Sequence, residues 1–431
     1  LISIGYSTCY WCHRMAEEAF SDPAIGSLLN TRFHSIKIDH EQHPELDARY
    51  TRLQRLSSGE VGWPVTVIET AEGEPLFIGA YLERDALHAL LQRLSTLQQR
   101  APAVLASMAA SLRSIAAEPP QTIGDATLAM TDPTAFLAAE WDTEHGGRAG
   151  AQKFPEPALL WWLYEQAVVA VHPQAEQALH LQLNRMAGSG LFDPLHGGFF
   201  RYATRSDWGH PHFEKMLYTQ SQLLALYARA GQHWNHPGWL AIAGSLRDFA
   251  ERWLRDADGL YASAVDARYA GTEGGYYLLQ PAAAQPLLAE FDWLEVDTID
   301  GLLQPRLSPS ALRSDTLADR LSALQAHTPR SNRPFVDSKS LTAWNALHAS
   351  ALLQWFDASG DPQALADATR IVDQLWQRFD PTSGVLHRDQ HRRVPGALSD
   401  YALLAQALLE LHARTLDPDA LSRSAVLLQR A

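Results

Sequence analysis

The two cysteines of this chain lie three residues apart, in the segment "STCYWCHRM" at positions 7–15. Cys9 falls where a strand-like run gives way to a helix-like one. Its sulfur is therefore expected at a helix N-terminus, where unpaired N–H groups and the helix dipole favour the thiolate. Cys12 lies one turn further on the same face, placed to attack Cys9 in a mixed disulfide. The pair predicts thiol–disulfide exchange, with Cys9 as the nucleophile and Cys12 as the resolving thiol.

Two other interpretations of the cysteine pair remain open, a metal site and an inert pair. A zinc site would need two further ligands, and four histidines are near in sequence, namely His13, His34, His40 and His43. A second C-x-x-C or H-x-H pair at the usual spacing is missing. We therefore expect neither a metal nor a cofactor.

The dipeptide Trp63-Pro64 opens the strand-like run "WPVTVIET". In an α/β domain that carries a C-x-x-C, this is where thioredoxin folds place a cis proline against the redox pair. The alternative is an ordinary trans proline at the start of an edge strand. We expect Trp63 and Pro64 to lie near Cys9, together with the adjoining Tyr10, Trp11 and His13.

Lysine is rare in this chain, which holds 35 Lys plus Arg but only four lysines. Three of them, Lys153, Lys215 and Lys339, lie in distinctive segments. Burial shifts the pKa of a lysine ammonium group readily, whereas an arginine guanidinium stays charged. We regard these lysines as ligand-binding candidates, and ion pairs that brace helix ends as the equal alternative.

The segment "HPHFEKMLY" places His212 and Glu214 two residues apart, just before an expected helix. Glu214 and Lys215 are interpreted as a polar pair in a ligand site, or as a buried ion pair that fixes helix packing. Acids, an amide and aromatic rings are the groups that carbohydrate sites use. The further candidates are Asp266, Asp337, Trp344, Asn345, Asp400 and Tyr401.

These residues need two domains to position them. With 431 residues, 46% of them hydrophobic, the chain is long enough for more than one core at about 150 residues per domain. Residues 1–99 read as strand, helix (12–30), strand, helix, two strands and a last helix (84–100), which is an α/β order. We place the first domain at 1–117, including a trailing helix, and a Pro-rich linker at 118–124.

The remainder, residues 125–431, looks helical and repeats itself. Four segments carry an Asp followed by Gly, namely "EWDTEHGG", "LFDPLHGGFF", "LRDADGLY" and "RFDPTSGVL". A period of 50 to 60 residues is typical of stacked helix pairs that bury their apolar faces against one another. The length allows five or six such hairpins, and we expect them to close into an (α/α)6 barrel with the Gly-rich turns around a central pocket.

The charge of the chain limits the classes of partner that it is expected to bind. The net charge is −14 and basic residues form no cluster, so we expect no nucleic acid and no membrane partner. Because the chain begins at Leu1, inside a predicted strand, we expect the first elements of the domain and any targeting peptide to lie upstream. A cytoplasmic location is expected, with the periplasm as the alternative.

Several motifs, in order, resemble the thioredoxin-like family that includes spermatogenesis-associated protein 20. They are "SIGYSTCYWCHRM", "IKIDHEQHPELD", "GWPVTV", "KFPEPALL", "PHFEKMLYTQSQL", "SAVDA", "DSKSLTAWNAL" and "SDYALL". The resemblance implies a thioredoxin fold followed by a six-hairpin, glycosidase-like or epimerase-like barrel. The chain departs from the family at Tyr10 (commonly His), Thr219 (commonly Asp) and Arg268 (commonly Asp). Ser3 stands where thioredoxins carry a buried Asp.

Three classes of function follow. The first is a thiol–disulfide oxidoreductase whose barrel binds a protein thiol or disulfide client, or a sugar-like ligand. The second is a carbohydrate-active epimerase, isomerase or hydrolase with an accessory thioredoxin domain. The third is a non-catalytic binding protein. The intact C-x-x-C at a helix start favours the first.

Overall fold

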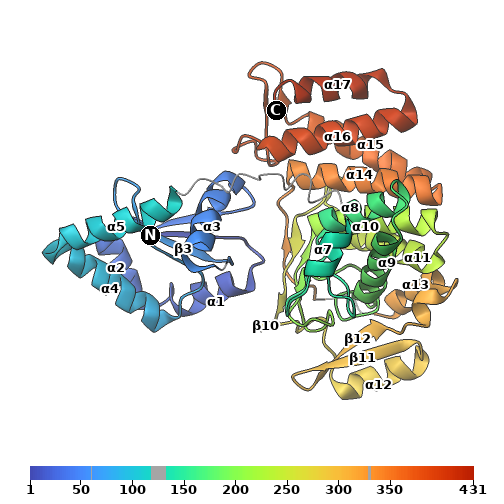
Figure 1. Ribbon diagram of the computed structural model, residues 1–431, viewed down its shortest axis with the longest axis horizontal. Helices are drawn as coiled ribbons and strands as arrows, with labels where there is room; N and C mark the ends of the chain where they lie inside the picture. The colour runs from blue at the N-terminus through green and yellow to red at the C-terminus, as the bar shows by residue number, and fades with distance from the viewer. Residues whose placement is uncertain (60, 118–132, 329–331) are drawn as a thin grey trace. The chain divides into compact units, whose positions relative to one another are not determined.

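The computed structural model describes residues 1–59, 61–117, 133–328 and 332–431. The chain divides into two compact units, Leu1–Gly124 and Asp125–Ala431 (Figure 1). The predicted linker, 118–124, lies outside the described residues.

A four-stranded sheet organises the first unit, with the strand order β2-β1-β3-β4. Strands β1 and β2 are parallel, whereas β1/β3 and β3/β4 are antiparallel. This arrangement is the thioredoxin fold, and the elements follow the order expected from the sequence. Their bounds are β1 Ile2–Gly5, α1 Tyr10–Glu18, α2 Pro23–Arg32, β2 Ile36–Asp39, α3 Pro44–Ser58, β3 Val65–Glu69, β4 Pro75–Gly79, α4 Arg84–Arg100 and α5 Pro102–Ala116.

The single helix expected over residues 12–30 is wrong, because two helices occupy this stretch. Helix α1 ends at Glu18, and α2 begins at Pro23. The Asp22 carboxylate accepts hydrogen bonds from the Ala24 and Ile25 amides at 2.8 and 3.1 Å. An Asp N-cap followed by Pro is a strong helix start, and it outweighs the continuous apolar pattern.

The sheet core fixes where β1 ends. Ile4 lies opposite Val65 across the β1/β3 pair, and both are fully buried with Val67 and the α3 residue Tyr50. Because side chains alternate along a strand, a one-residue slip would move this whole set to the opposite face of the sheet. The register therefore holds the carboxyl end of β1, and with it the start of α1, in a defined place.

Helix hairpins build the second unit. Helices α8, α10, α14 and α16 pack side by side as an inner layer, and each is paired with an outer helix, α9, α11, α15 or α17 (Figure 1). The inner helices span Pro157–Val168, Leu217–His233, Thr342–Ser359 and Leu398–Thr415. The outer ones span Pro173–Ala187, Pro237–Phe249, Pro362–Trp376 and Pro418–Leu428.

Each outer helix begins with His-Pro or Asp-Pro. The residue before the proline is the N-cap, and its side chain accepts a backbone N–H of the first turn. The four N-caps are His172, His236, Asp361 and Asp417. Proline in the first turn gives up no intrahelical hydrogen bond. These dipeptides mark the point in each hairpin where the chain turns from the inner to the outer layer.

The connections from outer to inner helices carry short strands and minor helices. They run over residues 188–216, 250–341 and 377–397, and the segment 141–156 leads likewise into α8. Their elements are β5 Tyr202–Ala203, β6 Pro211–His212, β7 Lys215–Met216, η1 Ala250–Leu254, β8 Ala264–Val265, β9 Arg268–Tyr269, β10 Thr272–Glu273, α12 Pro281–Glu290, β11 Leu294–Ile299, β12 Leu302–Leu307, η2 Ala311–Arg313, α13 Leu317–His327, β13 Val336–Asp337, β14 Phe379–Asp380 and β15 Val385–Leu386. Helix α7, Pro133–Glu140, packs on α9.

The predicted fold class, a thioredoxin fold followed by an array of helical hairpins, is confirmed. Within the described ranges four hairpins are formed, α8/α9, α10/α11, α14/α15 and α16/α17, against the five or six that the length allows. None of the described helices is long and apolar enough to cross a bilayer.

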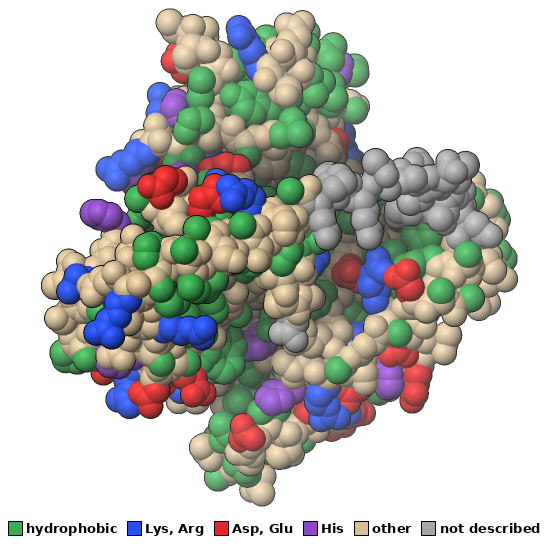
Figure 2. All heavy atoms as spheres, turned by 60° about the vertical axis from the view of Figure 1, so that its left-hand side comes forward, with side chains coloured by type: hydrophobic (Ala, Val, Ile, Leu, Met, Phe, Trp, Pro, Cys, Tyr) green, Lys and Arg blue, Asp and Glu red, His purple; other side chains and the backbone are tan. Residues whose placement is uncertain are grey.

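On the face drawn in Figure 2, acidic and basic side chains lie next to one another.

Candidate functional site

The cysteine pair lies at the start of helix α1, as expected. Cys9 is the N-cap, and its sulfur accepts the Cys12 amide at 3.2 Å. The two cysteines are joined as a disulfide with their Cα atoms 5.2 Å apart. No acidic residue lies in the first turn of α1. The helix end therefore favours negative charge on Cys9 once the disulfide is opened.

The two sulfurs differ in their surroundings. Cys9 is only 3% exposed, whereas Cys12 is half-buried. Cys12 is packed against the end of β1, because a Cβ added at Gly5 would lie 2.6 Å from the Cys12 sulfur. Glycine at this position is thus required by the close approach of the backbone to Cys12.

The predicted neighbours of the pair take distinct positions. The Trp63-Pro64 bond is cis, as predicted, and Pro64 is buried. Trp11 is 43% exposed and contacts Tyr10 and Tyr81, with ring centroids 5.3 and 5.1 Å apart. His13 lies half-buried in the first turn, where its amide donates to the Cys9 carbonyl.

A cluster of aromatic and polar side chains surrounds His40, and the sequence motifs do not predict it. The His40 ring lies 4.8 Å from both the Tyr6 and the Trp63 rings. Its Nδ1 is 3.6 Å from Oδ2 of Asp47, and the Trp63 indole N–H donates to Oδ1 of Asp47 at 2.8 Å. The sequence gives only a partial indication of this cluster, because it presents His40 as one of four histidines near the cysteine pair.

In the second unit, every predicted candidate precedes or begins an inner helix. Lys153 lies before α8, while His212, Glu214 and Lys215 lie just before α10. Asp266, Asp337 and Lys339 lie before α14, Trp344 and Asn345 lie in its first turn, and Asp400 and Tyr401 lie in the first turn of α16. Because the inner helices pack side by side, their starts lie along one end of the unit, where the chain passes from the outer to the inner layer.

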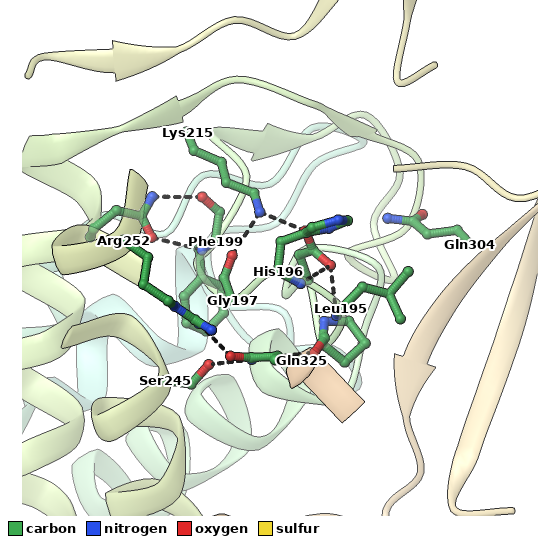
Figure 3. Close-up of polar contacts among 12 residues, drawn as sticks. Leu195, His196, Gly197, Phe199, Lys215, Ser245, Arg252, Gln304 and Gln325 are labelled. Atoms are coloured by element: carbon green, nitrogen blue, oxygen red, sulfur yellow. Dashed lines mark hydrogen bonds and ion pairs between the residues drawn. The ribbon is translucent and has the colours of Figure 1, made fainter. Parts of the chain in front are cut away.

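Lys153 and Lys215 brace the Gly-rich turns. The Lys153 ammonium donates to Oδ2 of Asp142 at 2.8 Å and to the Gly146 and Arg148 carbonyls, which uses its three protons. The Lys215 ammonium donates to Oδ2 of Asp193 at 2.6 Å and to the Gly197 carbonyl, toward which it points in Figure 3. Both lysines are at most 1% exposed. The contacts therefore favour the bracing interpretation for both.

The two braced turns are copies of one another. In each, the Asp carboxylate accepts two amides two and three residues on, and a His at i+3 faces its second oxygen. Two glycines with φ between 75° and 86° follow the histidine. Burial opposes ionisation of Asp193, yet Lys215 and His196 hold its pKa well below the usual range. In these two of its four copies, the Asp–Gly motif is thus a turn built around a carboxylate, which is buried at Asp193 and half-buried at Asp142.

Three other candidate side chains form hydrogen bonds with backbone groups. The Asn345 amide pairs with the Tyr261 N–H and C=O and with the Leu341 carbonyl. Asp400 accepts Arg388 at 2.7 Å and the Ala343 and Ala397 amides. The Tyr401 hydroxyl accepts the Leu386 amide. These side chains fix the starts of α14 and α16.

Asp337 and Lys339 form their own ion pair, with the ammonium 3.0 Å from Oδ2 of Asp337. Asp337 belongs to β13, whose partner strand β8 also pairs with β7, the strand of Lys215. Asp266 follows directly after β8 and is 4% exposed. The small sheet therefore gathers segments from two connections.

Glu214 is the centre of a second polar cluster. It is 3% exposed, and Arg201 donates to its Oε2 at 3.0 Å. Burial raises the pKa of Glu214 to about 7, and the nearby carboxylates Glu273 and Asp266 add to this rise, while Arg201 and His212 oppose it. The carboxyl group is therefore half protonated near neutrality and suited to exchange a proton.

An aromatic wall adjoins this cluster. The His212 Nδ1 lies 2.6 Å from Oε1 of Glu273, and its ring is 4.6 Å from that of Tyr202. Tyr202 in turn stacks on Phe154, which is 45% exposed. Trp344 contacts Tyr218 at 4.9 Å between ring centroids. Partly exposed rings beside titratable groups can cover an apolar ligand face while polar groups bind its hydroxyls.

The structure thus brings His212, Glu214 and Asp266 together and leaves Lys153, Asn345, Asp400 and Tyr401 in bracing roles. Arg201, Tyr202 and Glu273 were missed, because isolated charged or aromatic residues in a loop carry no spacing signal. Across the described part of the chain, no group of three or more His, Cys, Asp or Glu residues is arranged to hold a metal ion.

Comparisons with known proteins agree with this organisation. Residues 1–116 match the model of the thioredoxin-like DsbH family, described as a protein of unknown function, DUF255. The chain is 29% identical to human spermatogenesis-associated protein 20 over 95% of its own length and 62% of that protein. The chain therefore spans about 62% of the length of this relative. The resemblance predicted from the motifs is confirmed.

Two further matches complete the comparison. An uncharacterised protein of Caenorhabditis elegans is 26% identical over the whole chain and 68% of its own length. Among solved structures, the cellobiose 2-epimerase of Bacillus thermoamylovorans aligns with a TM-score of 0.45 and 12% identity, covering 68% of this chain and 67% of the epimerase. A likeness this weak says nothing about the reaction of this chain.

Proposed function

We propose that the first unit is a thiol–disulfide oxidoreductase that exchanges electrons with a protein client. The observation that carries the proposal is the Cys9 sulfur at the N-cap of α1, bonded by the Cys12 amide at 3.2 Å. A thiolate in this position gains from the helix dipole and from the N–H groups of the first turn.

The reaction needs only the two cysteines and the client. The Cys9 thiolate attacks one sulfur of a client disulfide, and the other client sulfur leaves as a thiolate. Cys12 loses its proton and attacks Cys9, which closes the Cys9–Cys12 disulfide and frees the second client thiol. Two electrons pass from the pair to the client, and a client dithiol reverses the sequence.

The two cysteine variants test the assignment. Cys9→Ser should abolish exchange, whereas Cys12→Ser should accumulate a mixed disulfide with a client or with glutathione, visible by mass spectrometry. The greater exposure of Cys12 makes the comparison informative. Trapping by Cys9→Ser instead of Cys12→Ser would reverse the two roles, and full activity in both variants would overturn the function.

A second candidate function belongs to the second unit, the binding of a sugar-like ligand at the Glu214 cluster. The observation in its favour is a buried carboxyl group with a pKa near 7 beside His212, Arg201 and the stacked rings of Tyr202 and Phe154. Such a group donates or accepts a proton at a hydroxyl or glycosidic oxygen.

Calorimetric titration with neutral mono- and disaccharides tests this second function. Glu214→Gln should weaken the binding of any sugar that the wild type binds, by about tenfold for one lost charge-assisted hydrogen bond. Glu290→Gln is the matched control, because Glu290 is a solvent-exposed carboxylate of the same unit. Unchanged affinity in Glu214→Gln would leave this residue a packing role.

A further inference from the structure

We infer that His40, held by Asp47, is the proton acceptor of Cys9, an inference that rests on the proposed thiol–disulfide function. The first step is position. The His40 amide donates to the Gly5 carbonyl at 2.9 Å, and the Cys9 amide donates to the Tyr6 carbonyl at 3.3 Å. His40 and the cysteine pair therefore follow adjacent parallel strands, β2 and β1, at the same carboxyl edge of the sheet.

The second step is the orientation of the ring. Tyr6 comes from the segment that leads into Cys9. Trp63 lies two residues before Val65, which pairs with Ile4 at the end of β1, and its ring is 6.2 Å from that of Tyr6. The two rings that contact His40 therefore both lie at the carboxyl end of β1. Asp47 Oδ2 faces Nδ1 of His40, and Oδ1 is fixed by the Trp63 indole. A carboxylate facing Nδ1 at 3.6 Å favours the tautomer with its proton on Nδ1, which leaves Nε2 as the proton acceptor.

The third step is a polar atom left over. Nε2 of His40 is inaccessible to solvent and has no hydrogen-bond partner among the described residues. The hydroxyl of Thr8, the residue before Cys9, is fully buried and equally without a partner in this part of the chain. A buried polar atom without a hydrogen-bond partner is unfavourable. A thiol or thiolate at Cys9, present only when the disulfide is open, would satisfy such groups.

The titratable groups that face His40 are Asp47 from α3 and Tyr6 after β1. Asp39 and Glu41 adjoin it in sequence. In the exchange reaction the Cys9 S–H gives its proton to Nε2 of His40, and the thiolate attacks the client disulfide. The imidazolium then returns the proton to the departing client thiolate. This role replaces the one that a buried acid takes in thioredoxins, where Ser3 stands in this chain.

The test is the pH dependence of Cys9 alkylation by iodoacetamide in the full chain carrying Cys12→Ser. His40→Gln should raise the apparent thiol pKa by about one unit, which slows alkylation about tenfold below that pKa. Asp47→Asn should shift the profile in the same direction by less. His43→Gln is the control, since His43 is more exposed and pairs with Glu45 at the start of the same helix.

A second measurement separates this inference from the proposed function. The reversibility of the Cys9–Cys12 couple is followed in glutathione buffers for the wild type and His40→Gln, with circular dichroism as the check on folding. One outcome would overturn the role of His40 alone. In it, the couple closes and opens, but the rate of Cys9 alkylation in His40→Gln stays within twofold of the parent from pH 5 to 9. A wild-type couple that never closes overturns the function itself. Should His40→Gln fail to fold, His40→Asn takes its place under the same criteria.

Discussion

Gly5 ends strand β1 at the point where Cys12 comes closest to the backbone. Any side chain there would meet the Cys12 sulfur, because an added Cβ lies only 2.6 Å from it. Glycine is thus needed beside the cysteine pair because it lacks a side chain, not because of its conformational freedom.

Gly5→Ala should therefore disfavour the closed disulfide. We expect a reduction potential shifted toward easier reduction, by about 30 mV for each 1.4 kcal/mol of strain, measured against glutathione. Gly62→Ala is the control, since a Cβ at Gly62 meets nothing within 4 Å. An unchanged potential in Gly5→Ala would show that Cys12 moves away without cost.

Residue patterns revealed the candidate sites unevenly. Cys9, Cys12 and Pro64 were predicted because their chemistry depends on spacing, and Glu214 because it lies two residues after His212. Arg201 and Glu273 could not be predicted, because contacts between separate connections leave no pattern in the local sequence. Asn345 and Asp400 resembled ligand groups, and their hydrogen bonds to backbone could be seen only in the structure.

At the scale of elements, the Asp-braced turns position the starts of two inner helices, α8 and α10. The Asp193 turn is buried with Lys215, whereas the Asp142 side chain of the other copy is 16% exposed. Water can therefore stabilise Asp142 more readily than Asp193 when the lysine is removed.

Lys215→Met should lower the free energy of unfolding by about 3–5 kcal/mol, because it leaves the buried Asp193 carboxylate without its ammonium partner. Lys153→Met should cost less, and Lys37→Met, at an exposed position, less than about 0.5 kcal/mol. Urea unfolding of the three variants measures the order. Equal losses for Lys215→Met and Lys37→Met would contradict the bracing role.

The elements of the first unit were predicted nearly in full, because its strands are apolar and its helices amphipathic. The exception was the break before α2, which the Asp22-Pro23 pair announces. In the second unit, the His-Pro and Asp-Pro starts of the outer helices would have located each hairpin from sequence. The pairing of short strands such as β7 and β8 could not be predicted, since two residues are too few to show a period.

For the molecule as a whole, buried histidines link stability to pH. His348 on α14 is 1% exposed, faces the Ser221 hydroxyl at 3.1 Å, and has its pKa lowered to about 3 by burial. The unfolded chain, with a histidine pKa near 6.5, binds this proton first. Stability that is fully present above pH 6.5 is therefore lost as the pH falls toward 3.

Between pH 6 and 4, protonation of His348 in the unfolded chain should lower the free energy of unfolding by about 1.4 kcal/mol for each unit by which the pH falls. His348→Asn should remove that part of the slope, measured by urea unfolding at several pH values. His327→Asn is the control, as its side chain is 58% exposed. A slope identical in His348→Asn and the wild type would contradict a neutral buried His348.

The matching turns at Asp142 and Asp193 also separate what repeats in the second unit from what varies. Each turn has the same acid, histidine, glycine pair and lysine, although other residues of the two segments differ. The connection before α14, by contrast, carries α12, β11, β12 and α13. An insertion within such a connection should therefore leave the helix hairpins on either side of it in place.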